Sequence, residues 1–272
     1  MQGIGNDFVV LDGINQSINF SAEQYRQIAD RHFGIGCDQI LLVEAAEDDS
    51  VDFKYRIFNA NGNEVEQCGN GARCFARFVK EKKLSNKPII RVATKNNVIV
   101  LEIDSKNLVT VNMGTPKFNP LDIPFNAPEV SNRYQLLVDG ESIEIGAVSM
   151  GNPHGVLLVG DLQTAPVLSL GAKLECHKSF PAHANIGFMQ IMSRKAIKLR
   201  VFERGSGETL ACGSGACAAV VVGQRWGLLD QEVQVQLPGG DLLIRRQSED
   251  AEVLMSGPAE FVFEGEISLT DC

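Results

Sequence analysis

Two distant segments of the chain carry almost the same cysteine-containing phrase. Residues 62–74 read GNEVEQCGNGARC and residues 206–217 read SGETLACGSGAC. Each places a Glu four residues before a Cys, continues with Cys-Gly-x-Gly-Ala, and reaches a second Cys shortly afterwards. Because a thiolate is both a base and a nucleophile, Cys68 and Cys212 are the first candidates for chemistry.

The residues that follow each of these cysteines predict a helix. Apolar side chains recur at helical spacing over residues 72–83 and 216–226. A helix N-terminus presents unpaired N–H groups and a partial positive charge, and glycines there let a carboxylate approach the backbone. The same field stabilises a thiolate, so we expect the pKa of Cys68 and of Cys212 to lie below its usual value of about 8.5.

The repetition extends beyond the cysteines. Four further pairs of segments recur in the same order: 5–6 with 151–152, 35–40 with 186–191, 56–59 with 200–203, and 113–116 with 255–258. The shared order indicates two structurally similar halves, duplicated and fused. We expect the boundary in the proline-rich stretch 116–128, where neither strand nor helix is easily sustained.

Two such halves facing each other across a cleft would present Cys68 and Cys212 from opposite sides of a ligand. One thiolate could then remove a proton while the opposite thiol delivers one, which inverts a stereocentre. Both helix ends would hold the ligand's carboxylate and stabilise the developing carbanion. The resting pair should therefore be one thiolate and one thiol.

The remaining pattern predicts halves that are rich in β-structure. A helix over 22–32 is expected to open at Ser21 as its N-cap, with a counterpart near 161–171. Short β-branched runs predict strands, at 89–92, 98–103, 108–112, 147–150, 156–159, 197–202, 233–237 and 242–245.

Other interpretations of the cysteines carry less weight. A single Cys-Gly-x-Gly is a weak signal, because most cysteines are small buried hydrophobes, and Cys74 and Cys217 inside the predicted helices are assigned to packing. The two cysteines of each motif are separated by five and by four residues at the start of a predicted helix. This spacing fits a zinc site poorly, so no metal is predicted. A redox disulfide between Cys68 and Cys212 would not explain why Gly-Asn and Glu recur in both halves.

For Glu64 and Glu208, a functional role and a loop carboxylate that bonds nearby N–H groups remain equally open.

Composition narrows the class of protein. The chain has 272 residues, 44% of them hydrophobic and 22% charged, as in soluble globular proteins. A net charge of −9 argues against nucleic-acid binding, and no apolar run is long enough for a membrane helix. Seven cysteines without a disulfide-like grouping and without a signal peptide favour a reducing compartment, so a cytoplasmic location is expected.

The segments GIGNDFVVLD, FNANGNEVEQCGNGARC, SMGNPH, ANIGFMQI and ERGSGETLACGSGAC resemble the signature segments of the diaminopimelate epimerase family, in order and over essentially the whole chain. The resemblance implies interconversion of LL- and meso-2,6-diaminopimelate without pyridoxal phosphate, metal or other cofactor. It places the chain in the synthesis of lysine and of peptidoglycan precursors. It also implies a homodimer, with Phe263 at the position of the family's dimer-forming tyrosine.

The same resemblance implies the site residues. Cys68 and Cys212 are the two acid/base residues, and His154 and Glu203 tune their proton affinity. The implied substrate contacts are Asn6, Gln39, Asn59, Gly69, Asn70, Asn152, Asn185, Glu203, Arg204, Gly213 and Ser214. Backbone N–H groups at the two Cys-Gly segments would hold the carboxylate at the reacting carbon, and an arginine would grip the distal one. A site that binds both ends of the substrate would exclude ordinary amino acids.

The fold implied is α/β (α+β), with two pseudo-symmetric domains of the diaminopimelate epimerase type, each a β-barrel-like sheet wrapped around a central helix. The expected domains are 1–116 with a last strand within 259–272, and 117–258, with the active site in the cleft between them. That last strand is expected around 261–267. The chain starts at Met1-Gln2-Gly3, where the family usually has a few more residues, so either the first strand is shortened or the true start lies upstream.

Three other functions are less consistent with the motifs. Proline and hydroxyproline racemases usually carry Cys-Gly-His-Gly first and Asp-Arg-Ser-Pro-Cys-Gly-Thr second, which Asn70 and Glu203-Arg204 contradict. A phenazine-pathway isomerase of the same fold lacks the cysteines. A thiol redox sensor is the alternative of another class, and it would not exchange a substrate's α-proton with solvent.

Overall fold

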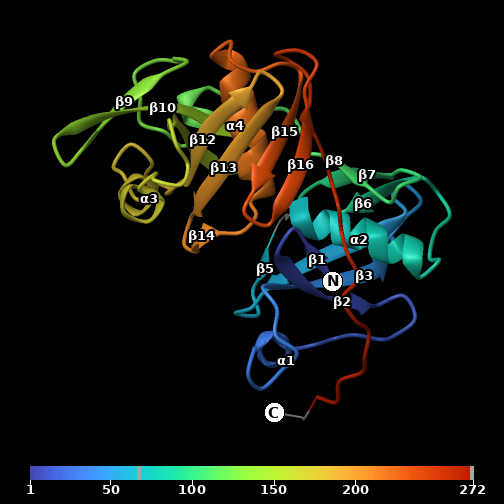
Figure 1. Cartoon of the computed structure of the whole chain (residues 1–272). Helices are drawn as coiled ribbons and strands as arrows, with labels where there is room; N and C mark the ends of the chain where they lie inside the picture. Colours follow the sequence, from blue (N-terminus) through green and yellow to red (C-terminus); the bar gives the residue numbers. More distant parts are fainter. Residues whose placement is uncertain (66–68, 270–272) are drawn as a thin grey trace. The chain divides into compact units, whose positions relative to one another are not determined.

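The computed structural model describes residues 1–65 and 69–269 (Figure 1). The chain divides into two compact units, Met1–Asn112 with Ser256–Cys272, and Met113–Met255. Within the described ranges, each unit combines a mixed sheet with two α-helices, so the expected mixed α/β class is confirmed. Among the described residues, no helix has the length and apolar character needed to cross a membrane.

The first unit, over its described residues, is built from short strands and two helices. The strands are β1 (Gln2–Gly3), β2 (Asn6–Asp12), β3 (Gln39–Ala45), β4 (Phe53–Asn59), β5 (Glu64–Val65), β6 (Ile89–Ala93), β7 (Val98–Ile103) and β8 (Val109–Asn112). The helices are α1 (Ala22–Ala29) and α2 (Gly69–Glu81). The pairs β2–β3 and β4–β6 are parallel, while β1–β2, β3–β4, β4–β5, β6–β7 and β7–β8 are antiparallel.

The second unit uses the same kinds of element. Its strands are β9 (Tyr134–Val138), β10 (Glu141–Ser149), β11 (Pro153–Leu158), β12 (Asn185–Ser193), β13 (Ala196–Glu203), β14 (Gly207–Thr209), β15 (Glu232–Leu237) and β16 (Gly240–Arg245). A 3₁₀ turn (Pro120–Asp122) and the helices α3 (Val167–Glu175) and α4 (Gly213–Arg225) complete it, and β17 (Leu254–Gly257) leads back to the first unit.

The two units repeat one topology. β11–β12 is parallel, β12–β13 antiparallel, β13–β14 antiparallel and β13–β15 parallel, as are β2–β3, β3–β4, β4–β5 and β4–β6. The register also agrees, because Phe58 lies opposite Glu64 and Phe202 lies opposite Glu208. Equivalent residues can therefore be assigned from strand pairing as well as from the sequence.

Strand register corrects one of the sequence matches. Phe8 lies opposite Gln39 in the first unit, and His154 lies opposite Asn185 in the second. Gln39 is therefore equivalent to Asn185, and the match of 35–40 with 186–191 is wrong. Similar apolar strands resemble one another when shifted along the chain, but only one register keeps each side chain on its own face of the sheet.

The second helix of each unit is its core. Ten of the thirteen residues of α4 are buried, so this helix is apolar nearly all round, as an enclosed helix must be. In β13, Val201 faces α4 and Phe202 faces α3, because a Cβ added to Gly215 or to Gly171 would lie 3.0 or 2.7 Å from those side chains. The two helices thus cover opposite faces of this sheet, as Figure 1 also shows.

Most predicted elements are present, with shifted ends. Both core helices start three residues earlier than predicted, because the Gly-rich turns belong to their first turn. α1 opens at Ser21 as predicted but ends at Ala29, and α3 lies about one turn later than 161–171. β1 has two residues.

The expected strand at 261–267 is wrong. Residues 258–269, all of them described, contain no strand, and the last one before them is β17, at Leu254–Gly257. The chain nevertheless returns to the first unit, where Gln2 and Glu260 exchange two backbone hydrogen bonds of 2.9 Å. Phe261 then stacks on Phe78 with ring centroids 6.3 Å apart, so side-chain packing replaces further strand pairing.

The Ser21 cap offers a test of the local folding rules. Its hydroxyl accepts from the Gln24 N–H, and the Gln24 side chain accepts from the Ser21 N–H, which forms a capping box. We expect Ser21→Ala to destabilise α1 by about 1 kcal/mol, which speeds amide hydrogen exchange in this helix about fivefold. Ser17→Ala, at an exposed loop position, is the control. Equal exchange in both variants would contradict the assigned cap.

Candidate active site

Cys212 is the N-cap residue of α4, with extended backbone (φ −125°, ψ 103°) and only 3% of its surface exposed. Its carbonyl accepts the Ala216 N–H at 2.9 Å, which starts the helix. A Cβ on Gly215 would lie 3.1 Å from the sulfur and 3.0 Å from Val201 Cγ2. A glycine is therefore required for the sulfur to rest against the first turn.

The sulfur of Cys212 meets a carboxylate. Cys212 Sγ donates to Glu203 Oε2 at 3.1 Å, and the Thr209 hydroxyl donates to the other oxygen, Oε1. Glu203 ends β13 and Thr209 ends β14, the two antiparallel strands that precede α4. Each oxygen of Glu203 thus receives a donor, and the group acts on the sulfur as a negative charge.

Burial raises the pKa of the Cys212 thiol above its ordinary value, and the negative charge and hydrogen bond of Glu203 raise it further. The Gly215 N–H and the Ser214 hydroxyl act in the opposite direction but do not prevail. The expected lowering of this pKa by the helix N-terminus is therefore wrong. Desolvation of a fully buried thiolate outweighs the helix field, so Cys212 is a neutral thiol.

A chain of polar contacts continues from Cys212. The Ser214 hydroxyl lies 3.7 Å from the sulfur and accepts from Asn152 Nδ2 at 3.5 Å. Asn152 Oδ1 lies 2.9 Å from His154 Nε2, and because an amide oxygen only accepts, that ring nitrogen carries the hydrogen. These sequence-predicted residues thus form one network around the start of α4.

His154 is a neutral, buried histidine. Only 1% of its surface is exposed, and it lies on β11 opposite Asn185. Burial, with the nearby positive charge of Arg204, lowers the pKa of His154 to about 3. At neutral pH the ring therefore acts through its fixed hydrogen bond to Asn152 and not as a cation.

Asn185 and Arg204 are joined through the backbone. Asn185 Nδ2 donates to the Pro153 carbonyl at 3.2 Å, and its Oδ1 accepts the Arg204 N–H at 3.0 Å. The guanidinium of Arg204 donates to the Ala182 carbonyl at 3.2 Å while the residue is otherwise exposed. Asn185 thus fixes the chain just where Glu203 and Arg204 leave β13.

The predicted residues of the first unit form two pairs. Gln39 Nε2 donates to Asn59 Oδ1 at 2.8 Å across β3 and β4. Asn70 Nδ2, in the first turn of α2, donates to Asn6 Oδ1 at 3.3 Å. Gly69 opens that helix, and the predicted catalytic Cys68 lies outside the described residues.

A charged cluster that the sequence did not predict supports Asn6. Asn6 Nδ2 donates to Asp38 Oδ2 at 2.7 Å, and Asp38 Oδ1 accepts from Arg31 at 2.8 Å. Arg31 also holds both oxygens of Asp7 at 2.8 Å. Although burial opposes it, hydrogen bonding to Arg31 keeps the pKa of Asp7 below its ordinary value. In the sequence, the sign of this cluster is Asp38 directly before Gln39, and only Gln39 was predicted as a site residue.

The repeated glutamates are ion-paired to arginines. Arg56 Nε and Nη2 donate to the two oxygens of Glu64 at 3.2 and 2.9 Å, and Arg200 donates to Glu208 in the same way at 2.6 and 2.8 Å. The alternative of a loop carboxylate that bonds nearby N–H groups is therefore wrong, and a functional role for these glutamates stays a prediction. Each pair clamps the strand that leads to a cysteine onto the strand that ends in Asn59 or Glu203.

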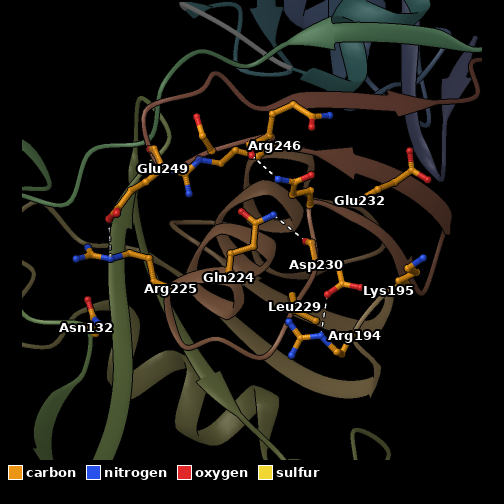
Figure 2. A pocket seen from close by; sticks show the side chains of 13 residues that line it. Asn132, Arg194, Lys195, Gln224, Arg225, Leu229, Asp230, Glu232, Arg246 and Glu249 are labelled. Carbon is orange, nitrogen blue, oxygen red and sulfur yellow. Dashed lines mark hydrogen bonds and ion pairs between the residues drawn. The ribbon is translucent and has the colours of Figure 1, made fainter.

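The second unit also contains a cavity of about 820 Å³, which is separate from the predicted site residues. Figure 2 shows its charged lining, and none of the sequence-predicted residues lines it. Arg194 pairs with Asp230 at 2.7 Å and Arg225 with Glu249 at 3.8 Å, so the side chains satisfy one another. In the part of the chain that the structure describes, no three His, Cys, Asp or Glu side chains are grouped to hold a metal ion.

Solved structures with this fold define its class. A phenazine biosynthesis protein of the PhzF family from Bacillus anthracis superposes with a TM-score of 0.68 at 17% identity, covering 99% of this chain and 95% of that one. A predicted epimerase from Pseudomonas aeruginosa gives 0.67 at 14%, covering 99% and 98%. A hydroxyproline epimerase from Agrobacterium vitis gives 0.65 at 13%, covering 94% and 87%. The architecture is therefore the fold of diaminopimelate epimerase, PhzF and proline racemase.

Sequence comparison narrows this class to one family. The diaminopimelate epimerase family model matches residues 1–119 and 146–262. The diaminopimelate epimerase of Laribacter hongkongensis is 58% identical over 271 residues, and that of Nitrosospira multiformis is 54% identical over 269. These matches cover 99% of this chain and 98% and 97% of the relatives. The chain belongs to the diaminopimelate epimerase family, which confirms the resemblance seen in its motifs.

The neutral state of His154 has a consequence for stability. In the unfolded chain the ring takes a proton below about pH 6.5, whereas in the folded chain its pKa is about 3. Stability is therefore lost as the pH falls through this window, because the unfolded state binds the extra proton. We expect the urea midpoint to drop more between pH 7.5 and pH 5 in the wild type than in His154→Gln. Equal drops would contradict a depressed pKa.

Proposed function

We propose that this chain interconverts LL- and meso-2,6-diaminopimelate by a cofactor-independent, two-base mechanism in which Cys68 and Cys212 act as base and acid. Membership of the diaminopimelate epimerase family supports the substrate and the reaction. The observation that carries the mechanism is the Cys212 thiol, buried at the start of α4 and bonded to Glu203. Such a thiol can act as a general acid, and the helix N-terminus beside it is suited to bind a carboxylate.

The raised pKa of Cys212 supports one assignment of the starting roles. Since Cys212 is the protonated partner, Cys68 is the thiolate that removes the substrate's α-proton, which breaks the C–H bond and forms a thiol. The carbanion then takes the proton of Cys212 on its opposite face, and the electron pair of the S–H bond stays on that sulfur. Turnover leaves the charges exchanged, as required for the enzyme to act on the other isomer.

Substrate binding follows from the chemistry of the remaining residues. We propose that the N–H groups of the two Cys-Gly turns, Gly69-Asn70 and Gly213-Ser214, hold the carboxylate next to the reacting carbon. The ionised Glu203 suits the adjacent ammonium group. The guanidinium of Arg204 suits the distal carboxylate as a two-pronged donor, with amides of Asn6, Gln39, Asn59, Asn152 and Asn185 completing the recognition of both ends.

The broader setting is also a proposal. We propose that the active site draws one cysteine from each domain, 1–116 with 259–272 and 117–258, and that the enzyme works in the cytoplasm in lysine and peptidoglycan precursor synthesis. A homodimer is proposed as well. Phe263, whose side chain is 67% exposed, is the candidate aromatic contact.

Deuterium exchange tests the reaction itself. When the protein is incubated with LL-diaminopimelate in deuterium oxide, we expect meso product labelled at the inverted α-carbon, since the incoming proton comes from a thiol equilibrated with solvent. Mass spectrometry and proton NMR detect the label, and heat-denatured protein is the control. A redox-sensing protein would produce no label, and that outcome would refute the proposed function.

Cysteine variants test the assigned roles. We expect Cys68→Ser and Cys212→Ser each to lower kcat about 10²- to 10⁴-fold, because a hydroxyl is a far weaker acid and base than a thiol. Cys176→Ser is the matched control, since Cys176 is exposed and outside the proposed machinery. Circular dichroism checks that each variant folds. A folded Cys212→Ser enzyme with near-normal turnover would show that this sulfur is not the acid.

A further inference from the structure

We propose that Thr209 is a positioning residue, which holds the ionised carboxylate of Glu203 against the Cys212 thiol. The inference rests on the proposed function, and it adds to that function a residue outside both the cysteine pair and the expected substrate contacts. The Thr209 hydroxyl and the Cys212 sulfur donate to different oxygens of Glu203, so Thr209 would act on the sulfur through that carboxylate.

The geometry gives each oxygen of Glu203 a donor. The Thr209 hydroxyl donates to Oε1 and Cys212 Sγ donates to Oε2 at 3.1 Å. The terminal torsion of a glutamate has broad, weakly defined minima, so each hydrogen bond to one of its oxygens helps to set the plane of the carboxylate. The second anchor fixes the plane of the group and keeps Oε2 directed at the sulfur.

Thr209 is itself held in place by the strand pair. It lies opposite Val201 in the β13–β14 ladder, and the neighbouring Glu208 lies opposite Phe202. Arg200 grips both oxygens of Glu208 at 2.6 and 2.8 Å and donates to the Leu162 carbonyl at 2.9 Å. The backbone of β14 is thus clamped to β13, which fixes the Thr209 hydroxyl relative to Glu203.

The first unit provides an internal comparison. There the equivalent of Glu203 is Asn59 and the equivalent of Thr209 is Val65, which lies opposite Ile57 in the matching ladder. The arginine–glutamate clamp is present in both units, so the strand pair does not need a hydroxyl at this position. The hydroxyl of Thr209 occurs in the unit that has the carboxylate of Glu203. In the first unit, the amide oxygen of Asn59 accepts from Gln39 Nε2 at 2.8 Å.

The hydroxyl matters because of charge. A donor on Oε1 stabilises the ionised form of Glu203, and the ionised, aimed carboxylate keeps the proton on Cys212 until the carbanion forms. Delivery of that proton breaks the S–H bond, forms the C–H bond and leaves the electron pair on sulfur. Loss of the Thr209 hydroxyl would remove one of the contacts that orient the carboxylate and leave the thiol less firmly protonated.

The test compares Thr209→Val with Thr209→Ser. Valine keeps the β-branched shape and removes the hydroxyl, while serine restores the hydroxyl. Thr164→Val is the matched control, because the Thr164 hydroxyl also donates to a carboxylate, Asp161 Oδ2 at 3.2 Å, on the exposed surface of the same unit. Melting temperatures and circular dichroism establish that all three variants are folded.

We expect Thr209→Val to lower kcat about 10- to 100-fold, the effect of losing one hydrogen bond to a charged group, with KM changed less than about threefold. Thr209→Ser should recover kcat to within about threefold of the wild type. Thr164→Val should match the wild type. A Thr209→Val enzyme with unchanged kcat, or a folded serine variant as impaired as the valine variant, would overturn the proposal.

A second readout does not depend on turnover. Iodoacetamide alkylation of Cys212 at about pH 8, followed by peptide mass spectrometry, should be about threefold faster in Thr209→Val, since a thiol freed from the carboxylate is more often ionised. An unchanged or slower rate would contradict the positioning role. If alkylation responds as expected but the wild type incorporates no deuterium from solvent, the proposed function fails while the positioning role stands.

Discussion

The contact between the Cys212 thiol and the Glu203 carboxylate is the interaction on which the rest of the site depends. Two opposing electrostatic effects meet at this sulfur. The N-terminus of α4 favours a thiolate, whereas burial and an adjacent negative charge favour the thiol. Because Cys212 is almost entirely buried, burial and the carboxylate prevail. In the proposed function, the helix end then remains available for a substrate carboxylate.

The two units share one frame and differ in the side chains that it holds. Strand order, register, the enclosed helix and the arginine–glutamate clamps recur in both units. The side chains that meet within this frame differ. Asn59 corresponds to Glu203 and Phe8 corresponds to His154. In the proposed two-base mechanism, such a difference would decide which cysteine carries the proton at rest, whereas two equivalent thiols would share a single proton between them.

The sequence predicted the frame well because its signals are local. Residues 98–103 alternate in the strand period, and Ser21 with Gln24 has the spacing of a capping box, so each needs only nearby residues for its conformation. Long-range contacts left no comparable pattern. The pKa of Cys212 depends on its burial in the folded unit, and the support of Asn6 by Asp38 joins residues 32 positions apart. The strand at 261–267 was implied by the family resemblance and not by a local pattern, and in the structure the ring of Phe261 stacks on Phe78 of α2 instead.

The equivalent residues Asn6 and Asn152 show how second partners decide what a side chain offers. Asn6 gives its amide hydrogens to Asp38, which can only accept, so its oxygen faces Asn70 in the first turn of α2. Asn152 gives its oxygen to the N–H of His154, so its amide hydrogens face Ser214 in the first turn of α4. The same residue type therefore presents an acceptor at one helix end and a donor at the other. A substrate carbon that carries both an ammonium and a carboxylate group needs both kinds of partner. The Nε2–H of His154 holds the Asn152 oxygen and so leaves the amide hydrogens for Ser214, and burial keeps the ring neutral while it does so.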